Sequence, residues 1–144
     1  MTDEVLKQAS KELLEYFPDI RNLEFFKYEL QIDPELQLAY SLYSGFFSEV
    51  ISPLLRSESV NGFSIERIVE FINTIFNHNG VDIVFLDVLV IEWLQPMASL
   101  ILHPQEGYDT NKLLSVKSSL SGKALDEFKF ELNEGPAPKL SAQG

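Results

Sequence analysis

Apolar residues recur at intervals of three and four along most of the chain, which is the period of a helix with one buried face. The first stripe of this kind consists of Val5, Leu6, Ala9, Leu13 and Leu14. Thr2 is a capping residue for this helix, and Phe17-Pro18 ends it. A second, shorter helix is expected from about Asp19, where an acidic residue favours the positive end of the helix dipole.

Asp33-Pro34 is a strong signal for the start of a third helix, because Asp caps helix N-termini and Pro fits the first helical position. We expect this helix to run from Pro34 toward Arg56, with weak points at Ser44-Gly45 and at Pro53. A fourth helix is expected between a cap at Ser64 and a stop at Asn79-Gly80.

The segment from Val81 to Gln95 is the most apolar part of the chain. Its β-branched residues would suit a strand, but the polar residues at 82, 87 and 92 break strict alternation, and the segment exceeds the usual strand length. We therefore predict a helix with apolar residues nearly all round. Such a helix belongs in the middle of a bundle. A further short helix is expected over Pro96 through Leu102. The 81–94 stretch is shorter than the roughly 20 apolar residues that a bilayer requires.

The C-terminal part is expected to hold a sixth helix capped by Asp109 or Thr110, a break at Ser121-Gly122 and a last amphipathic segment. The sequence thus predicts an all-α protein. It is an irregular antiparallel bundle of about six to seven helices around a central apolar helix at about 81–95. A single domain over 1–134 and a flexible tail over 135–144 complete the expected organisation, and no fixed-period repeat stands out.

The charge balance limits the partners. With 22 acidic and 11 basic residues the net charge is −11, which repels phosphate backbones and anionic lipid headgroups. We expect neither nucleic-acid nor membrane binding. The absence of Cys fits a reduced compartment, and the acidic N-terminus lacks the basic region of a secretory signal. A cytoplasmic location is therefore expected.

Catalytic and metal-binding patterns are weak. His78 and His103 stand in no known metal-ligand spacing, no phosphate-binding glycine loop occurs, and the serines at 41, 44 and 48 lack an activating neighbour. Asp82, Asp87 and Glu92 interrupt the central helix, but at 100° per residue successive members point about 140° apart. We expect no enzyme activity, no metal and no cofactor.

Acidic and aromatic residues gather in two stretches without Lys or Arg, Tyr28 to Leu55 and Ile68 to Asn111. Tyrosines beside carboxylates are typical of surfaces that bind a basic protein. The candidate partner-binding residues are Glu29, Asp33, Glu35, Tyr40, Tyr43, Glu49, Glu70, Asp82, Asp87, Glu106 and Asp109. The alternative, that the aromatic residues simply pack in the core, stays open.

Four segments carry a resemblance to a known class of protein. They are Phe17-Pro18-Asp19-Ile20, Tyr40-Ser-Leu-Tyr-Ser-Gly-Phe-Phe47, Ile68-Val-Glu-Phe-Ile-Asn73 and Val90-Ile-Glu-Trp-Leu94. Over about residues 10 to 130 the chain resembles small acidic all-helical immunity proteins of bacterial polymorphic and contact-dependent toxin systems. The resemblance implies a cytosolic inhibitor that is made beside a cognate toxin and blocks the toxin's active domain.

Three hypotheses follow. The first is an immunity protein that occludes a toxin with a basic active-site surface, for which an acidic inhibitor gains steered association. The second is a non-enzymatic scaffold or adaptor, or a homodimer formed through the apolar helix at 81–94. The third and weakest is an enzyme with an unrecognised carboxylate site.

Overall fold

The protein is a bundle of helices, described by a computed structural model over residues 2–137. Its elements are α1 (Thr2–Tyr16), η1 (Pro18–Asn22), α2 (Glu24–Ile32), α3 (Ala39–Phe46), η2 (Phe47–Ile51), α4 (Ser52–Leu55), α5 (Ile65–Phe76), α6 (Ile83–Leu89), η3 (Val90–Leu94), α7 (Gln95–Leu102), α8 (Thr110–Ser119) and α9 (Gly122–Glu131). The elements from α3 to α4 form one continuous helix, and so do those from α6 to α7. The described residues therefore form seven helices, apart from the short 3-10 helix η1, and no strand. The all-α prediction is confirmed.

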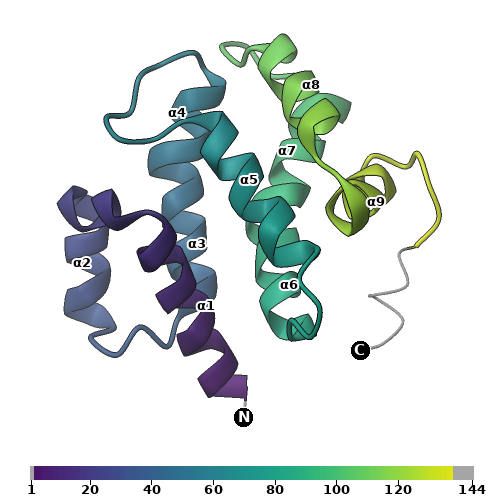
Figure 1. The fold of residues 1–144 in the computed structure, drawn as a ribbon. Coiled ribbons are helices and arrows are strands. Elements are labelled where there is room, and N and C mark those ends of the chain that lie inside the picture. The colour runs from purple at the N-terminus through teal and green to yellow at the C-terminus, as the bar shows by residue number, and fades with distance from the viewer. Residues whose placement is uncertain (1, 138–144) are drawn as a thin grey trace.

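The α6–α7 helix lies in the middle of the bundle (Figure 1). It contacts α1, α3 and α5 through α6, and α8 and α9 through η3 and α7. The prediction of a central apolar helix is confirmed, and the helix is longer than expected, from Ile83 to Leu102. By length and composition it could cross a bilayer, but half of its most apolar window is buried inside the fold.

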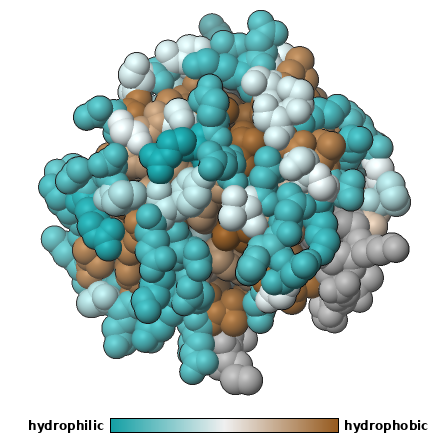
Figure 2. All heavy atoms as spheres, viewed as in Figure 1, coloured by the Kyte–Doolittle hydropathy of each residue, from teal (hydrophilic) through white to brown (hydrophobic). Residues whose placement is uncertain are grey.

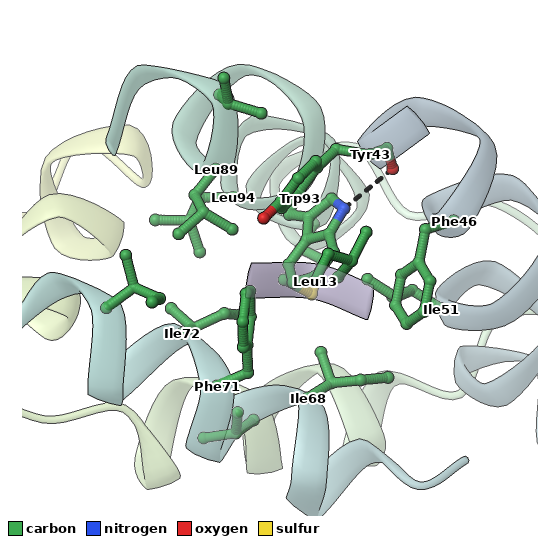
Figure 3. Packing of buried hydrophobic residues seen from close by; sticks show 14 of the residues in the cluster. Leu13, Tyr43, Phe46, Ile51, Ile68, Phe71, Ile72, Leu89, Trp93 and Leu94 are labelled. Carbon is green, nitrogen blue, oxygen red and sulfur yellow. Dashed lines mark hydrogen bonds between the residues drawn. The ribbon is translucent and has the colours of Figure 1, made fainter. Parts of the chain in front are cut away.

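An aromatic cluster at the centre of the core joins four helices (Figure 3). The indole N–H of Trp93 in η3 donates to the carbonyl of Tyr43 in α3 at 2.9 Å, and the Tyr43 hydroxyl donates to the carbonyl of Ala9 in α1 at 2.7 Å. Phe46 stacks on Trp93 with ring centroids 5.2 Å apart, and Phe71 of α5 lies 5.7 Å from it. Each buried polar atom of this cluster therefore has a partner, as a stable core requires.

Two wide turns of π-helix, η2 and η3, each precede a proline. In η2 the N–H of Ser52 bonds to the carbonyl of Phe47, five residues back, and the same spacing recurs in η3. Pro53 and Pro96 supply no N–H, and the ring of each crowds the carbonyl four residues earlier. A turn with one extra residue accommodates this without a break. The predicted weak point at Pro53 is thus a widened turn inside a continuous helix.

The two helix pairs α3–α5 and α6–α8 follow the same plan. In each pair a helix widened by a π-turn is followed by a loop and then by the second helix. Each loop closes with a glycine, an aromatic residue and a residue that caps the second helix, Gly62-Phe63-Ser64 and Gly107-Tyr108-Asp109. Both glycines have positive φ, +90° and +95°, which favours glycine. Both caps form, with Ser64 accepting the N–H of Arg67 and Asp109 accepting those of Asn111 and Lys112. This shared plan was not apparent from the sequence.

The expected helix start at Asp33-Pro34 is wrong. Asp33 ends α2, and its carboxylate accepts the N–H groups of Gln37 and Leu38 at 3.0 and 2.8 Å. Leu36 then adopts a left-handed φ of +56°, so that α3 begins only at Ala39. Asp33 was expected to cap a helix start, but its side chain stabilises the turn between α2 and α3.

Other predicted boundaries agree with the structure. Ser64 and Asp109 are caps, and the break before α9 falls at Ser121-Gly122. Helix α5 ends at Phe76, earlier than the predicted stop at Asn79-Gly80, and Gly80 with φ +85° belongs to the turn that follows. The expected second helix is divided into η1 and α2 by the extended residue Leu23. The side chain of Thr2 and residues 138–144 of the predicted tail lie outside the described part.

We predict that shortening Trp93 destabilises the whole bundle. Trp93→Ala should lower the free energy of unfolding by about 4 kcal/mol through lost packing and the cavity left behind. Trp93→Phe should lower it by about 2 kcal/mol, because the indole hydrogen bond to the Tyr43 carbonyl and part of the ring packing are lost. Urea unfolding followed by far-UV circular dichroism measures both. Tyr28→Ala, at a side chain that is 63% exposed, is the control and should change stability by less than about 0.5 kcal/mol.

Candidate functional site

Helix α3 presents a row of hydroxyl groups that bond to carboxylates on its two neighbours. Ser41 donates to Glu29 of α2 at 2.7 Å, and Tyr40 donates to Asp87 of α6 at 2.7 Å. The hydroxyl of Ser44 also interacts with Glu92 of η3. We call the six residues Glu29, Tyr40, Ser41, Ser44, Asp87 and Glu92 the α3 seam.

The amphipathic period of α3 explains why these hydroxyls face outward. Leu42, Tyr43 and Phe46 are buried in the core, which turns Tyr40, Ser41 and Ser44 toward the surface. Gly45 lets α2 approach closely, because a Cβ atom there would lie 2.7 Å from Cδ2 of Phe25. The close approach fits the short bond between Ser41 and Glu29.

The π-turn η3 brings Asp87 and Glu92 to the same side of the central helix. With ideal α-helical geometry they would point about 140° apart, and this was the argument against a joint role. In the π-turn η3, however, each residue turns by less than about 100°, so the angle between Asp87 in α6 and Glu92 in η3 is smaller than in an ideal α-helix. Asp87 accordingly meets Tyr40 while Glu92 meets Ser44, one turn further along α3. The expectation that these two carboxylates diverge is wrong.

Burial and the neighbouring charges shift two ionisation equilibria in the seam. Burial, followed by the hydrogen bond to Asp87 and the negative charges of Asp87 and Glu92, raises the pKa of Tyr40 to about 12. Burial also raises the pKa of Glu92, an effect that the hydroxyl of Ser44 partly offsets. The Oε2 atom of Glu29 is buried and accepts no hydrogen bond from a described residue. The seam therefore holds negative charge at a free-energy cost.

No cation inside the described part of the chain neutralises the seam. Two ion pairs form between described residues, Lys27 with Glu24 at 3.4 Å and Lys117 with Glu134 at 2.6 Å. Neither involves a seam residue. Hydroxyl groups hold the seam carboxylates in place and leave their negative charge uncompensated, and such carboxylates can attract an external Lys or Arg.

Three of the predicted partner-binding acids each have a structural role. Asp33 holds the turn after α2, as described above. Asp82 caps α6 by accepting the N–H of Val84 at 2.8 Å. Asp109 caps α8 and also accepts the hydroxyl of Ser57, and these bonds lower the pKa of the Asp109 carboxyl. At least one oxygen of each carboxylate is thus occupied by the backbone.

The other predicted residues do not gather on the seam. Tyr43 is fully buried, so the prediction that it contacts a partner is wrong. Glu35 and Glu49 are exposed beside the ends of α3, Glu70 lies on α5 within reach of Tyr16, and Glu106 lies in the loop before α8. The structure unites Glu29, Tyr40 and Asp87 from the predicted set. Ser41, Ser44 and Glu92 were not among the predicted residues. A sequence signal existed for Glu92, because Glu49 and Glu92 each stand four residues before a proline, where the helix widens.

A small cavity adjoins the seam at Asp87. It measures about 220 Å³ and lies between α6–η3 and α9, with apolar walls that include Leu86, Val90 and Phe130 and with the carboxylates of Glu127 and Glu131. Glu92 is not part of its lining. No group of three or more His, Cys, Asp or Glu side chains arranged to share a metal ion occurs among residues 2–137.

No protein-family model matches the chain, and no curated protein or solved structure matches it. The site must therefore be interpreted from its own geometry.

We predict that Glu92→Gln stabilises the protein near neutral pH. Burial raises the pKa of Glu92 in the folded protein above its value in the unfolded chain. The stability that comes from protonating Glu92 is therefore fully present below the unfolded pKa, and it is lost as the pH rises through the folded-state pKa. The thermal midpoint of Glu92→Gln should exceed that of the wild type near neutral pH, and the two should converge below about pH 4. Glu49→Gln, at the equivalent and exposed position of η2, should follow the wild-type pH profile. A constant offset for Glu92→Gln at every pH would contradict the prediction.

Proposed function

We propose that the protein is an immunity protein, which binds a cognate bacterial toxin domain and occludes a basic active-site surface. The observation that carries the proposal is the α3 seam, in which Glu29, Asp87 and Glu92 are held by hydroxyl groups without a compensating cation among the described residues. The net charge of −11 and the resemblance to immunity proteins support it.

Fixed carboxylates suit a tight inhibitor for a physical reason. A side chain that is already held in its bound geometry loses little conformational entropy when a partner arrives. Negative charge that is not neutralised internally also speeds the encounter with a cationic surface and opposes binding to anionic competitors. Occlusion needs no chemistry from the inhibitor, so the proposed protein is not an enzyme.

The test neutralises the seam and measures inhibition of a basic toxin domain encoded beside the gene. Glu29→Gln, Asp87→Asn and Glu92→Gln are combined, because each keeps the shape and a hydrogen-bond acceptor. The association rate with the toxin should fall about tenfold at low salt and less at high salt, since salt screens the attraction. Stopped-flow mixing measures the rate, and a toxin activity assay measures the protection.

A matched control removes the same charge from other faces. Glu15→Gln, Glu66→Gln and Asp126→Asn are exposed positions on α1, α5 and α9, and together they should leave the association rate within about twofold of the wild type. Equal losses in the two triple variants would show that total charge matters and the seam does not. Full toxin activity in the presence of excess wild-type protein would overturn the proposed function.

A second candidate function, a homodimerising scaffold, is favoured by the exposed apolar side chains around α2. Tyr28, Ile32 and Leu38 are 63%, 55% and 51% exposed, and the first two stand four residues apart on one helix face. The central helix is a poor dimer surface, since its large side chains are mostly buried within the monomer.

We predict that, if this second function holds, light scattering gives a mass of twice 16.4 kDa. The combined variant Tyr28→Glu and Ile32→Glu should then return the protein to a monomer, because it places charge on the apolar face. A wild-type mass of one chain at high concentration would exclude the dimer.

A further inference from the structure

A cleft separates α1 from the start of α6, on the opposite side of Phe85 from the centre of the core. It measures about 480 Å³, and its apolar floor is formed by Val5, Ile75, Val81 and Phe85. Figure 2 shows brown side chains sunk between teal ones near the lower centre of this face, over the lower ends of α1 and α6. The volume lies within the range of sites that hold a small ligand or one large side chain.

The floor of this cleft is held by the core. The ring of Phe85 meets the ring of Tyr43 edge to face at 6.3 Å, and Tyr43 is fixed by its hydrogen bond to Ala9 of α1. At the rim, Gly80 turns the chain with φ +85°, and a Cβ atom built there would meet no heavy atom within 4 Å. The cleft is therefore open at Gly80 and firm at its base.

Two carboxylates give the cleft its charge. Oε1 of Glu12 accepts Nε2 of Gln8 at 2.9 Å, and Oδ1 of Asp82 accepts the N–H of Val84 at 2.8 Å. Each carboxylate is thus oriented through one oxygen, and the other oxygen accepts no hydrogen bond from a described residue. Among the described lining residues the one basic side chain is the imidazole of His78, and no Lys or Arg is present. An apolar floor below an acidic rim is complementary to an apolar group with a cation beside it.

We propose that this cleft binds an aromatic or branched apolar side chain of a protein partner that is flanked by Lys or Arg. The apolar side chain fills the floor over Phe85, and the flanking cation meets Glu12 or Asp82. Burial of an aromatic anchor next to a charge pair is the usual composition of an interface hot spot. The inference is independent of the proposed function, since any basic protein segment with such an anchor would fit.

The experiment uses three short peptides and no toxin, so its failure is separate from failure of the proposed function. The peptides are acetyl-Lys-Phe-Lys-amide, acetyl-Glu-Phe-Glu-amide and acetyl-Lys-Ala-Lys-amide. Each is titrated into the isotope-labelled full chain, and the amide shifts of Val5, Ile75, Val81 and Phe85 are followed by NMR. The first peptide should give saturable shifts at these residues, with an affinity at least about tenfold higher than either of the others.

Two double variants test the role of the rim. Glu12→Gln combined with Asp82→Asn should abolish the preference for the Lys-Phe-Lys peptide over Glu-Phe-Glu. Both changes preserve the fold, because Gln keeps an acceptor for Gln8 and Asn is as good a helix cap as Asp. Glu15→Gln combined with Asp126→Asn removes the same charge outside the cleft and should leave the preference unchanged.

Each contrary result overturns the inference. Equal binding of Glu-Phe-Glu by the wild type contradicts the acidic rim as the source of selectivity, and equal binding of Lys-Ala-Lys contradicts the apolar floor as the anchor site. Shifts that do not saturate, or that appear only at residues away from the cleft, remove the site altogether. Well-dispersed spectra of the variants establish that they are folded.

Discussion

The structure depends on Tyr43, whose two ends bind different parts of the chain. Its hydroxyl donates to the carbonyl of Ala9 in α1, and its own carbonyl accepts the indole N–H of Trp93 in η3. A buried polar group that loses its partner costs about 1–3 kcal/mol. Because both bonds form only when α1, α3 and the central helix pack in one register, they favour that register over others. Tyr40 and Ser44 lie beside the buried face of the same helix, so their hydroxyl groups reach the carboxylates of the central helix. The packing of α3 in the core therefore places these two members of the α3 seam.

The π-turns have a similar double effect. They exist because Pro53 and Pro96 cannot supply the helix hydrogen bond, and a widened turn costs less than a break in a helix that the core needs to be continuous. In η3 the wider turn also reduces the angle between Glu92 and Asp87, and both carboxylates reach α3. A backbone adjustment forced by a proline thus determines the surface electrostatics several residues away.

The acidic residues of this protein serve two distinct purposes. Asp33, Asp82 and Asp109 accept backbone N–H groups and stabilise turns or helix starts. Glu29 and Asp87 accept side-chain hydroxyl groups and lie between helices. The first group is required by the fold, whereas the second holds charge with no compensating cation among the described residues. For this reason the net charge alone describes the available binding surface poorly.

The sequence by itself determined the helical class, the central apolar helix and the cap at Ser64, and it limited the cap of α8 to Asp109 or Thr110. These features could be predicted because amphipathic period and capping depend on residues within one or two turns. It did not determine the role of Asp33, since the same side chain can cap a helix or close a turn. Nor did it place Glu92 beside Ser44. Only the tertiary structure decided these points, because the register of a π-turn and the meeting of distant helices depend on how the whole core packs.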